Sequence, residues 1–278
     1  MNEPSPTTGA LPTSAPPRHR APRPASRVAR VLRYGYRVPL LLWHLLIDLP
    51  LAMLLLSPLT AGWRVRGERL DHRVIRLWSA GLVRVCGFRL RREGLPLPGA
   101  TLFVANHVTW ADIVVLNSQR MVGFVAKREI ARWPVVGWMA ARAETIFHQR
   151  GSTESLGGVL HEMLARLRAG RSVAVFPEGR TGNGAQIGPF HARIFLAAVE
   201  TGAPVQPVAL RYGERGDAQT RVAFQRGEHF VGNVLRLLGE PARRADVLFL
   251  EPIIPGASGG RRGIAELARE RIVQAMNG

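Results

Sequence analysis

A histidine and a carboxylate five positions apart form the most reactive arrangement in the sequence. His107 and Asp112 lie in Asn106-His107-Val108-Thr109-Trp110-Ala111-Asp112, directly after the apolar run 102–105. One continuous helix would point these two side chains about 140° apart, so a turn must bring them together. We expect Thr109 to be the N-cap of the next helix and Asp112 its third residue, as in a capping box. Asp112 would then orient the imidazole as a general base, the alternative being a purely structural hydrogen bond.

Charge and composition narrow the classes of protein that fit. The chain has 278 residues, 46% of them hydrophobic, and a formal net charge of +18, which indicates a sizeable core and an anionic partner: nucleic acid, anionic lipid or a phosphorylated substrate. The single cysteine, Cys86, excludes an internal disulfide framework and a multi-cysteine metal site. Cys86 lies in an apolar stretch, so we expect it to be buried and inert.

Lysine is almost absent from this basic chain. Lys127 is the only lysine, and the other 37 of the 38 basic residues are arginine. A lysine that persists in such a composition is a candidate for a position that needs a compact ammonium and not a planar guanidinium, although chance survival is the alternative.

The N-terminal part divides into a tail and a membrane-associating segment. Residues 1–26 are rich in Pro, Ser, Thr and Ala, which is typical of a disordered tail. Residues 27–69 begin with arginines at helical spacing and continue into the apolar run 38–59, which is near the length of a bilayer span. The alternatives are one span, a hairpin broken near Asp48-Leu49-Pro50, a pair of interfacial helices, or a buried helix of a soluble protein. We favour the half-inserted hairpin.

Residues 70–278 show the pattern of an α/β domain. Helices are expected over 71–84 and 155–169, where apolar residues recur at helical spacing. Short apolar runs predict strands at 102–105, 122–126, 145–147, 172–176, 205–210, 221–224 and 247–250. Strands alternating with helices favour a central, mostly parallel sheet flanked by helices, whose strand-end loops would meet near His107.

Four blocks at strand ends resemble those of a known family. They cover residues 106–112, 124–150, 173–184 and 203–210, and the third contains Phe176-Pro177-Glu178-Gly179-Arg180. In this order they are similar to the glycerolipid acyltransferase superfamily, which includes the 1-acyl-glycerol-3-phosphate acyltransferases. The resemblance extends over about residues 70 to 215, and the hydrophobic N-terminal segment also fits, so residues 70–278 are identified as an acyltransferase domain.

The resemblance implies attack of a lysolipid hydroxyl on an acyl thioester, carried by coenzyme A or by acyl carrier protein as co-substrate. No other cofactor, no metal and no acyl-enzyme are implied. His107 would be the general base and Asp112 its orienting partner. Arg180 suits two-point contact with a phosphate, and Gly179 allows close approach of backbone. The residues expected to bind the acceptor are Lys127, Arg150, Glu178, Gly179 and Arg180.

The third block departs from the common family pattern. Many members have Glu-Gly-Thr-Arg-Ser, whereas this chain has Glu178-Gly179-Arg180-Thr181-Gly182, with the arginine one position earlier and a glycine-rich loop after it. This variant resembles the branch that includes acyltransferases acting on lyso-ornithine lipid as well as ones acting on lysophosphatidate. Our main prediction is conversion of lysophosphatidate to phosphatidate in phospholipid biosynthesis, and lyso-ornithine lipid is the alternative acceptor.

The predicted location follows from the apolar segment and its flanking arginines. We expect association with anionic lipids at the cytoplasmic face of the inner membrane, as in a bacterial lipid-metabolic enzyme. A basic nucleic-acid-binding protein is a distant alternative based on charge alone. Sparse Tyr and Phe and the position of the arginines beside the Leu-rich segment disfavour it, so no nucleic-acid partner is expected.

Overall fold

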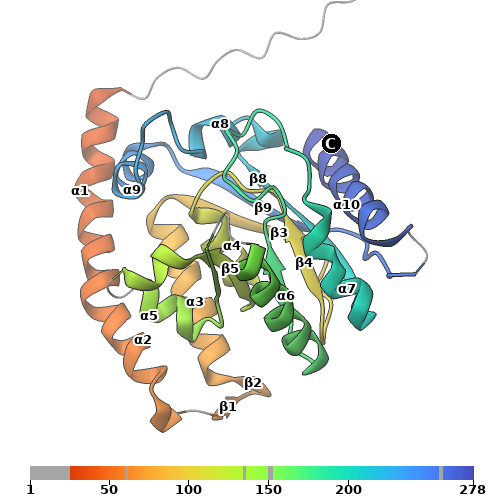
Figure 1. Cartoon of the computed structure of the whole chain (residues 1–278). Helices are drawn as coiled ribbons and strands as arrows, with labels where there is room; N and C mark the ends of the chain where they lie inside the picture. The colour runs from red at the N-terminus through yellow and green to blue at the C-terminus, as the bar shows by residue number, and fades with distance from the viewer. Residues whose placement is uncertain (1–25, 61, 134–135, 150–152, 257–258) are drawn as a thin grey trace, which may run out of the picture.

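A seven-stranded sheet forms the centre of the protein. The computed structural model describes residues 26–60, 62–133, 136–149, 153–256 and 259–278 (Figure 1). The strand order is β3-β9-β8-β4-β7-β5-β6, and only the β8–β9 pair is antiparallel. The strands are β3 Phe88–Glu93, β4 Leu102–Ala105, β5 Gly123–Lys127, β6 Ile146–His148, β7 Val173–Val175, β8 Val205–Tyr212 and β9 Arg243–Phe249. The predicted α/β fold with a mostly parallel sheet is confirmed.

Strand β4 has a central place because it pairs with β7 on one side and β8 on the other, both in parallel. Alternate side chains of a strand point to opposite faces of a sheet. Phe103 and Ala105 accordingly join one buried core, and Leu102 and Val104 join the other. This two-sided burial explains why β4 is an uninterrupted apolar run.

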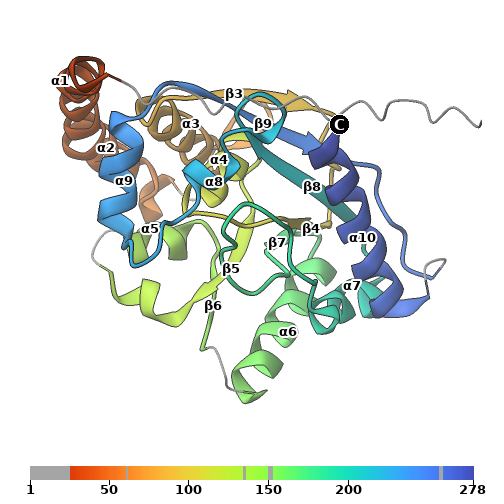
Figure 2. The ribbon, with the colours of Figure 1, turned by 90° about the horizontal axis from the view of Figure 1, so that it is seen from above.

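Helices cover both faces of the sheet (Figure 2). The core of Phe103 is shared with α3 Leu70–Val85, α4 Ala111–Gln119, α8 Gln219–Val222 and α9 Phe230–Gly239, and the core of Leu102 with α6 Thr153–Arg168, α7 Leu196–Thr201 and α10 Gly260–Asn277. The shorter elements are η2 Pro58–Thr60, β1 Arg64–Val65, β2 Glu68–Arg69, η3 Arg128–Arg132, α5 Val136–Arg142, η4 Ala192–Phe195 and η5 Glu214–Gly216.

Two strand predictions differ from the structure. The predicted strand at 221–224 is wrong, because α8 occupies Gln219–Val222 and a turn follows it. No strand was predicted at β3, which lies at the edge of the sheet and pairs with β9 alone. Its first four residues, 88–91, alternate apolar with charged side chains, as suits a strand with one exposed face.

The N-terminal segment forms one long helix, and the break predicted at Asp48-Leu49-Pro50 is absent. Helix α1 Arg27–Trp43, the π-helical turn η1 His44–Asp48 and α2 Leu49–Leu55 follow one another without interruption. Two contacts explain the continuity. The Leu49 N–H donates to the His44 carbonyl five residues back, and the Asp48 carboxylate lies 2.8 Å from His44 Nδ1. The chain reverses only after Leu55, so that α2 packs against α3.

The continuous helix Arg27–Leu55 is long and apolar enough to cross a membrane, by length and composition. At 1.5 Å per residue its 29 residues extend about 43 Å. One side packs against the domain, with Leu49 and Ala52 buried. The opposite side exposes large apolar side chains, among them Val28, Val31, Leu32, Tyr36, Leu40, Leu42, Trp43, Leu46, Leu51 and Leu54. An uncovered apolar face of this length is consistent with membrane association.

Candidate active site

The structure brings His107 and Asp112 into contact, as the sequence predicts. His107 Nδ1 lies 2.7 Å from Asp112 Oδ2. The same oxygen accepts the backbone N–H groups of Val108 and Thr109 at 2.6 and 2.9 Å. Because an ionised carboxylate only accepts, the imidazole donates from Nδ1 and leaves Nε2 as the free acceptor. Nε2 makes no hydrogen bond with any residue that the structure describes.

Only one of the two hydrogen bonds of the predicted capping box forms in the turn after β4. The Asp112 side chain reaches back to the Thr109 N–H, as expected. The Thr109 hydroxyl, however, does not cap α4, because it donates to Asn233 Oδ1 at 3.2 Å. Helix α4 begins at Ala111 with Trp110 as its N-cap residue. Asp112 therefore binds its donors from the first turn of α4 while pointing at the imidazole.

Aromatic rings fix the plane of the imidazole. The His107 ring stacks on Phe176, with centroids 3.9 Å apart and planes 13° apart. Phe176 in turn stacks on Phe124 at 5.5 Å. The His107 side chain is 14% exposed and that of Asp112 is fully buried. The ring thus keeps an opening to solvent on one side while its Asp112 contact is shielded.

The third block holds the backbone of His107. Glu178 Oε1 accepts the His107 N–H at 2.9 Å, and Glu178 Oε2 accepts the Gly188 N–H at 2.9 Å. The Gly182 N–H donates to the His107 carbonyl at 2.7 Å. Burial raises the pKa of Glu178, while these backbone donors and His107 act in the opposite direction. Both oxygens of Glu178 are therefore used in positioning the turn of His107 and the glycine-rich loop.

The other predicted acceptor residues lie at the same edge of the sheet or outside the described residues. Lys127 ends β5, and Gly179 and Arg180 follow β7; because these strands run parallel to β4, their carboxyl ends meet near His107. Gly179 adopts a φ of +70°, the left-handed conformation that favours glycine. Arg180 is exposed and makes no hydrogen bond or ion pair with the described residues. Arg150 lies outside the described residues.

Lys127 is available at this edge. Its side chain is 45% exposed, and its Nζ lies 3.9 Å from Glu129 Oε1. That contact is long and largely solvated, so it leaves the ammonium free to bind an anion. Cys86, in contrast, is fully buried, and burial raises its pKa to about 12, as expected for an inert thiol.

Two residues that no sequence pattern indicates, Tyr212 and Asn233, hold the turn of His107 and Asp112. The Tyr212 hydroxyl donates to Asp112 Oδ1 at 2.5 Å from the end of β8. Asn233 on α9 accepts from the Thr109 hydroxyl and from Trp110 Nε1 through its Oδ1. Both residues are distant from the turn in sequence, and no spacing pattern links them to it.

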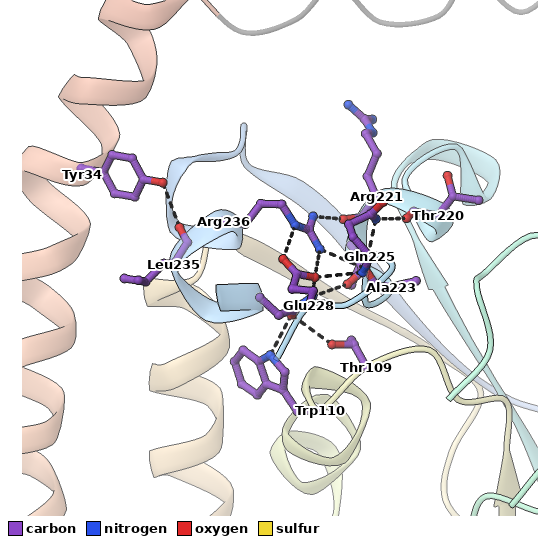
Figure 3. A network of polar contacts seen from close by, with 12 residues as sticks. Tyr34, Thr109, Trp110, Thr220, Arg221, Ala223, Gln225, Glu228, Leu235 and Arg236 are labelled. Carbon is purple, nitrogen blue, oxygen red and sulfur yellow. Dashed lines mark hydrogen bonds and ion pairs between the residues drawn. The ribbon is translucent and has the colours of Figure 1, made fainter. Parts of the chain in front are cut away.

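Helix α9 connects the turn of His107 to the N-terminal helix (Figure 3). Arg236 donates to Glu228 from Nε at 2.7 Å and to the carbonyls of Arg221 and Ala223. On the other side of α9, the Tyr34 hydroxyl of α1 donates to the Leu235 carbonyl at 3.0 Å. The apolar helix and the turn of His107 are therefore held by one intervening element.

A cavity of about 410 Å³ adjoins the turn of His107. Its lining includes Asn106, Val108 and Glu178 beside Arg215 and Arg269, but the imidazole of His107 does not line it.

Comparisons with known proteins show the family to which this chain is similar. The family model named Acyltransferase matches residues 89–211. The lyso-ornithine lipid O-acyltransferase of Pseudomonas aeruginosa is 34% identical over 227 residues, which are 78% of this chain and 87% of that protein. The 1-acyl-sn-glycerol-3-phosphate acyltransferase of Neisseria gonorrhoeae is 37% identical over 156 residues, 55% of this chain and 61% of that protein.

A solved structure shares the fold. The 1-acyl-sn-glycerophosphate (LPA) acyltransferase of Thermotoga maritima superposes with a TM-score of 0.69 over 89% of this chain and 96% of that one, at 18% sequence identity. At this identity the likeness concerns the fold alone.

Proposed function

The chain belongs to the acyltransferase family, and from that premise we propose that it is a lyso-ornithine lipid O-acyltransferase. The breadth of similarity supports this acceptor. Lyso-ornithine lipid O-acyltransferases of Pseudomonas aeruginosa and Brucella abortus align over 78% and 76% of this chain, whereas the Neisseria gonorrhoeae glycerophosphate enzyme aligns over 55%. The alternative acceptor in the sequence analysis is thus better supported than the main one.

The reaction proposed for His107 is general-base catalysis. Nε2 takes the proton of the lipid hydroxyl as the oxygen attacks the thioester carbonyl, and a carbon–oxygen bond forms. The tetrahedral intermediate then expels the thiolate, which takes the proton from the imidazolium. Asp112 stabilises the imidazolium and keeps Nε2 the basic nitrogen. The observation that carries the proposal is the 2.7 Å contact of Nδ1 with a fully buried carboxylate, which leaves Nε2 free.

The acceptor head group is proposed to bind at the cationic edge of the sheet. Ornithine presents a carboxylate and lysophosphatidate a phosphate, so either head group offers an anion to Arg180 and Lys127. The exposure of both cations suits such a contact. Lysophosphatidate remains the second candidate, since the Neisseria gonorrhoeae relative is 37% identical to this chain.

Membrane association is proposed to bring the enzyme to its lipid. The apolar helix Arg27–Leu55 would lie in or across the bilayer, and the net charge of +18 favours anionic lipids at the cytoplasmic face. Washing membranes tests this placement: detergent and not salt should release the protein. Release by salt alone would favour the nucleic-acid-binding alternative.

The decisive experiment compares acceptors directly. Purified protein is incubated with labelled acyl-CoA or acyl-acyl carrier protein and with lyso-ornithine lipid or lysophosphatidate in parallel. We expect faster transfer to lyso-ornithine lipid; preference for lysophosphatidate would refute the proposed acceptor. His107→Ala should abolish transfer to both, whereas His161→Ala, an exposed histidine of α6, should retain full activity. Substantial turnover by His107→Ala would refute the role of His107 as base.

A further inference from the structure

Tyr212 ends the central strand β8 and points into the core toward the catalytic turn. Its side chain is 1% exposed, and its ring packs on Phe88 with centroids 5.4 Å apart. Its backbone N–H donates to Gln219 Oε1 at 2.9 Å. Its hydroxyl donates to Asp112 Oδ1 at 2.5 Å. The tyrosine is thus held on three sides, with one polar atom directed at the carboxylate.

The two oxygens of Asp112 have unequal surroundings. Oδ2 accepts from His107 Nδ1 and from two backbone N–H groups. Oδ1 accepts from Tyr212 alone among the described residues. Because Asp112 is fully buried, no solvent can replace this donor. The hydroxyl is therefore a fourth donor, which holds the carboxylate at its second oxygen and draws negative charge away from the oxygen that faces the imidazole.

The hydroxyl stays protonated over any working pH. Burial, followed by the neighbouring Asp112, raises the pKa of Tyr212 well above its ordinary value. Tyr212 is therefore a permanent donor and not a titrating group. The titratable groups that face one another here are His107 and Asp112 of the turn, Tyr212 of β8 and Glu178 of the loop after β7.

We propose that Tyr212 is a positioning residue of the acyl transfer, which sets the strength and direction of the Asp112–His107 contact through its hydroxyl. This inference rests on the proposed role of His107 as base. Removing the hydroxyl concentrates the charge of Asp112 on Oδ2, so the imidazole retains its proton to higher pH and less base is available below neutrality. The carboxylate also loses its restraint, so turnover falls at every pH.

The test uses Tyr212→Phe, which keeps the ring and its packing. We expect kcat to fall about tenfold, as for loss of one hydrogen bond to a buried charge. The acceptor KM should be unchanged and the acid limb of the pH–rate profile should move to higher pH. Tyr34→Phe is the matched control, because it removes a tyrosine hydroxyl bond on α1. A Tyr212→Phe enzyme with wild-type kcat and pH profile would overturn the proposal.

A modification that strengthens the hydrogen bond of Tyr212 should shift the pH profile in the direction opposite to Tyr212→Phe. It therefore separates an effect of the hydroxyl from an effect of ring packing. The chain has three tyrosines, so Tyr34→Phe with Tyr36→Phe leaves Tyr212 as the single site for biosynthetic incorporation of 3-fluorotyrosine. A more acidic phenol donates a stronger hydrogen bond, so the acid limb should move to lower pH than in the unlabelled double variant. A shift in the same direction as in Tyr212→Phe, or no shift, would refute the role of the hydroxyl.

A second readout does not depend on turnover. Carbethoxylation of His107 by diethyl pyrocarbonate, followed by mass spectrometry across pH, reports when the ring loses its proton. Its midpoint should move to higher pH in Tyr212→Phe and remain in place in Tyr34→Phe. Should the wild type transfer no acyl group, the proposed function fails, while this midpoint still supports or refutes the contact of Tyr212 with the His107–Asp112 pair.

Discussion

Glu178→Gln separates two roles of the third block. The sequence resemblance assigns Glu178 to acceptor binding, whereas in the structure both of its oxygens accept backbone N–H groups, from His107 and Gly188. Glutamine keeps one acceptor oxygen and places an amide NH2 against the other N–H. A positioning role therefore predicts a lower kcat with little change in the acceptor KM, and direct acceptor contact predicts the reverse.

The magnitude follows from the bonds that are lost. One charge-assisted hydrogen bond is replaced by a donor–donor contact and the other loses its charge, at a cost of about 1.5–3 kcal/mol per bond to a charged group. Burial penalises the Glu178 carboxylate and raises its pKa, so a neutral amide recovers part of this cost. We expect a net loss of about 2 kcal/mol, or about 4–8 °C in Tm for a chain of this size.

The assay is steady-state transfer with varied acceptor, combined with thermal unfolding of the same preparations. Glu93→Gln is the matched control, because Glu93 pairs with Arg91 on β3 and both side chains are exposed, at 42% and 57%. Such exposed pairs contribute less than about 1 kcal/mol, so kcat and Tm should change little. A Glu178→Gln enzyme with normal kcat, normal Tm and a raised acceptor KM would refute the positioning role.

Further substitutions probe the cationic edge, the α9 network and the apolar helix. Arg180→Ala should raise the acceptor KM about tenfold and leave the thioester KM unchanged. Arg168→Ala, at the exposed end of α6, should alter neither KM. An effect of Arg180→Ala on the thioester KM alone would contradict the role of Arg180 in acceptor binding. Arg236 lowers the pKa of Glu228 to about 2, so the pair stabilises the fold above pH about 4.5 and loses this contribution as pH falls toward 2. In urea unfolding, Glu228→Gln should therefore be less stable than wild type at pH 7, with the difference shrinking on acidification. Leu46→Glu, at a position 67% exposed, should weaken co-sedimentation with vesicles without lowering Tm.

The sequence predicts the parts of the fold that rest on local patterns. The uninterrupted apolar run 102–105 marks β4, because that strand is buried on both faces. The stretch 221–224, an arginine followed by three apolar residues, forms the end of α8 and a turn, since so short a stretch carries no period that separates helix from strand. The sequence does not predict β3, because the arginines of this half-exposed edge strand interrupt the apolar run that marks a buried strand.

In the site, too, the sequence predicts contacts that are local in the chain but not those that depend on the fold. His107 and Asp112 are five positions apart, so a turn can join them and their spacing is informative. Tyr212 and Glu178 reach the turn through the order of strands in the sheet, which no local pattern specifies. The sequence predicts a break in the long helix because it shows Asp48 and Pro50 but does not show the π-helical turn His44–Asp48, which keeps the helix continuous.

Strand β4 pairs with β7 and β8, which both follow it in the sequence and are therefore synthesised later. The Glu178 contact spans 71 positions of the chain and the Tyr212 contact spans 100. A nascent chain that has emerged only to residue 200 contains His107 and Asp112 but lacks the strand that orders them. Pairings of such long range close late in folding. The donors around Asp112 are therefore complete only after β8 has been synthesised, because Tyr212 is the last residue of that strand.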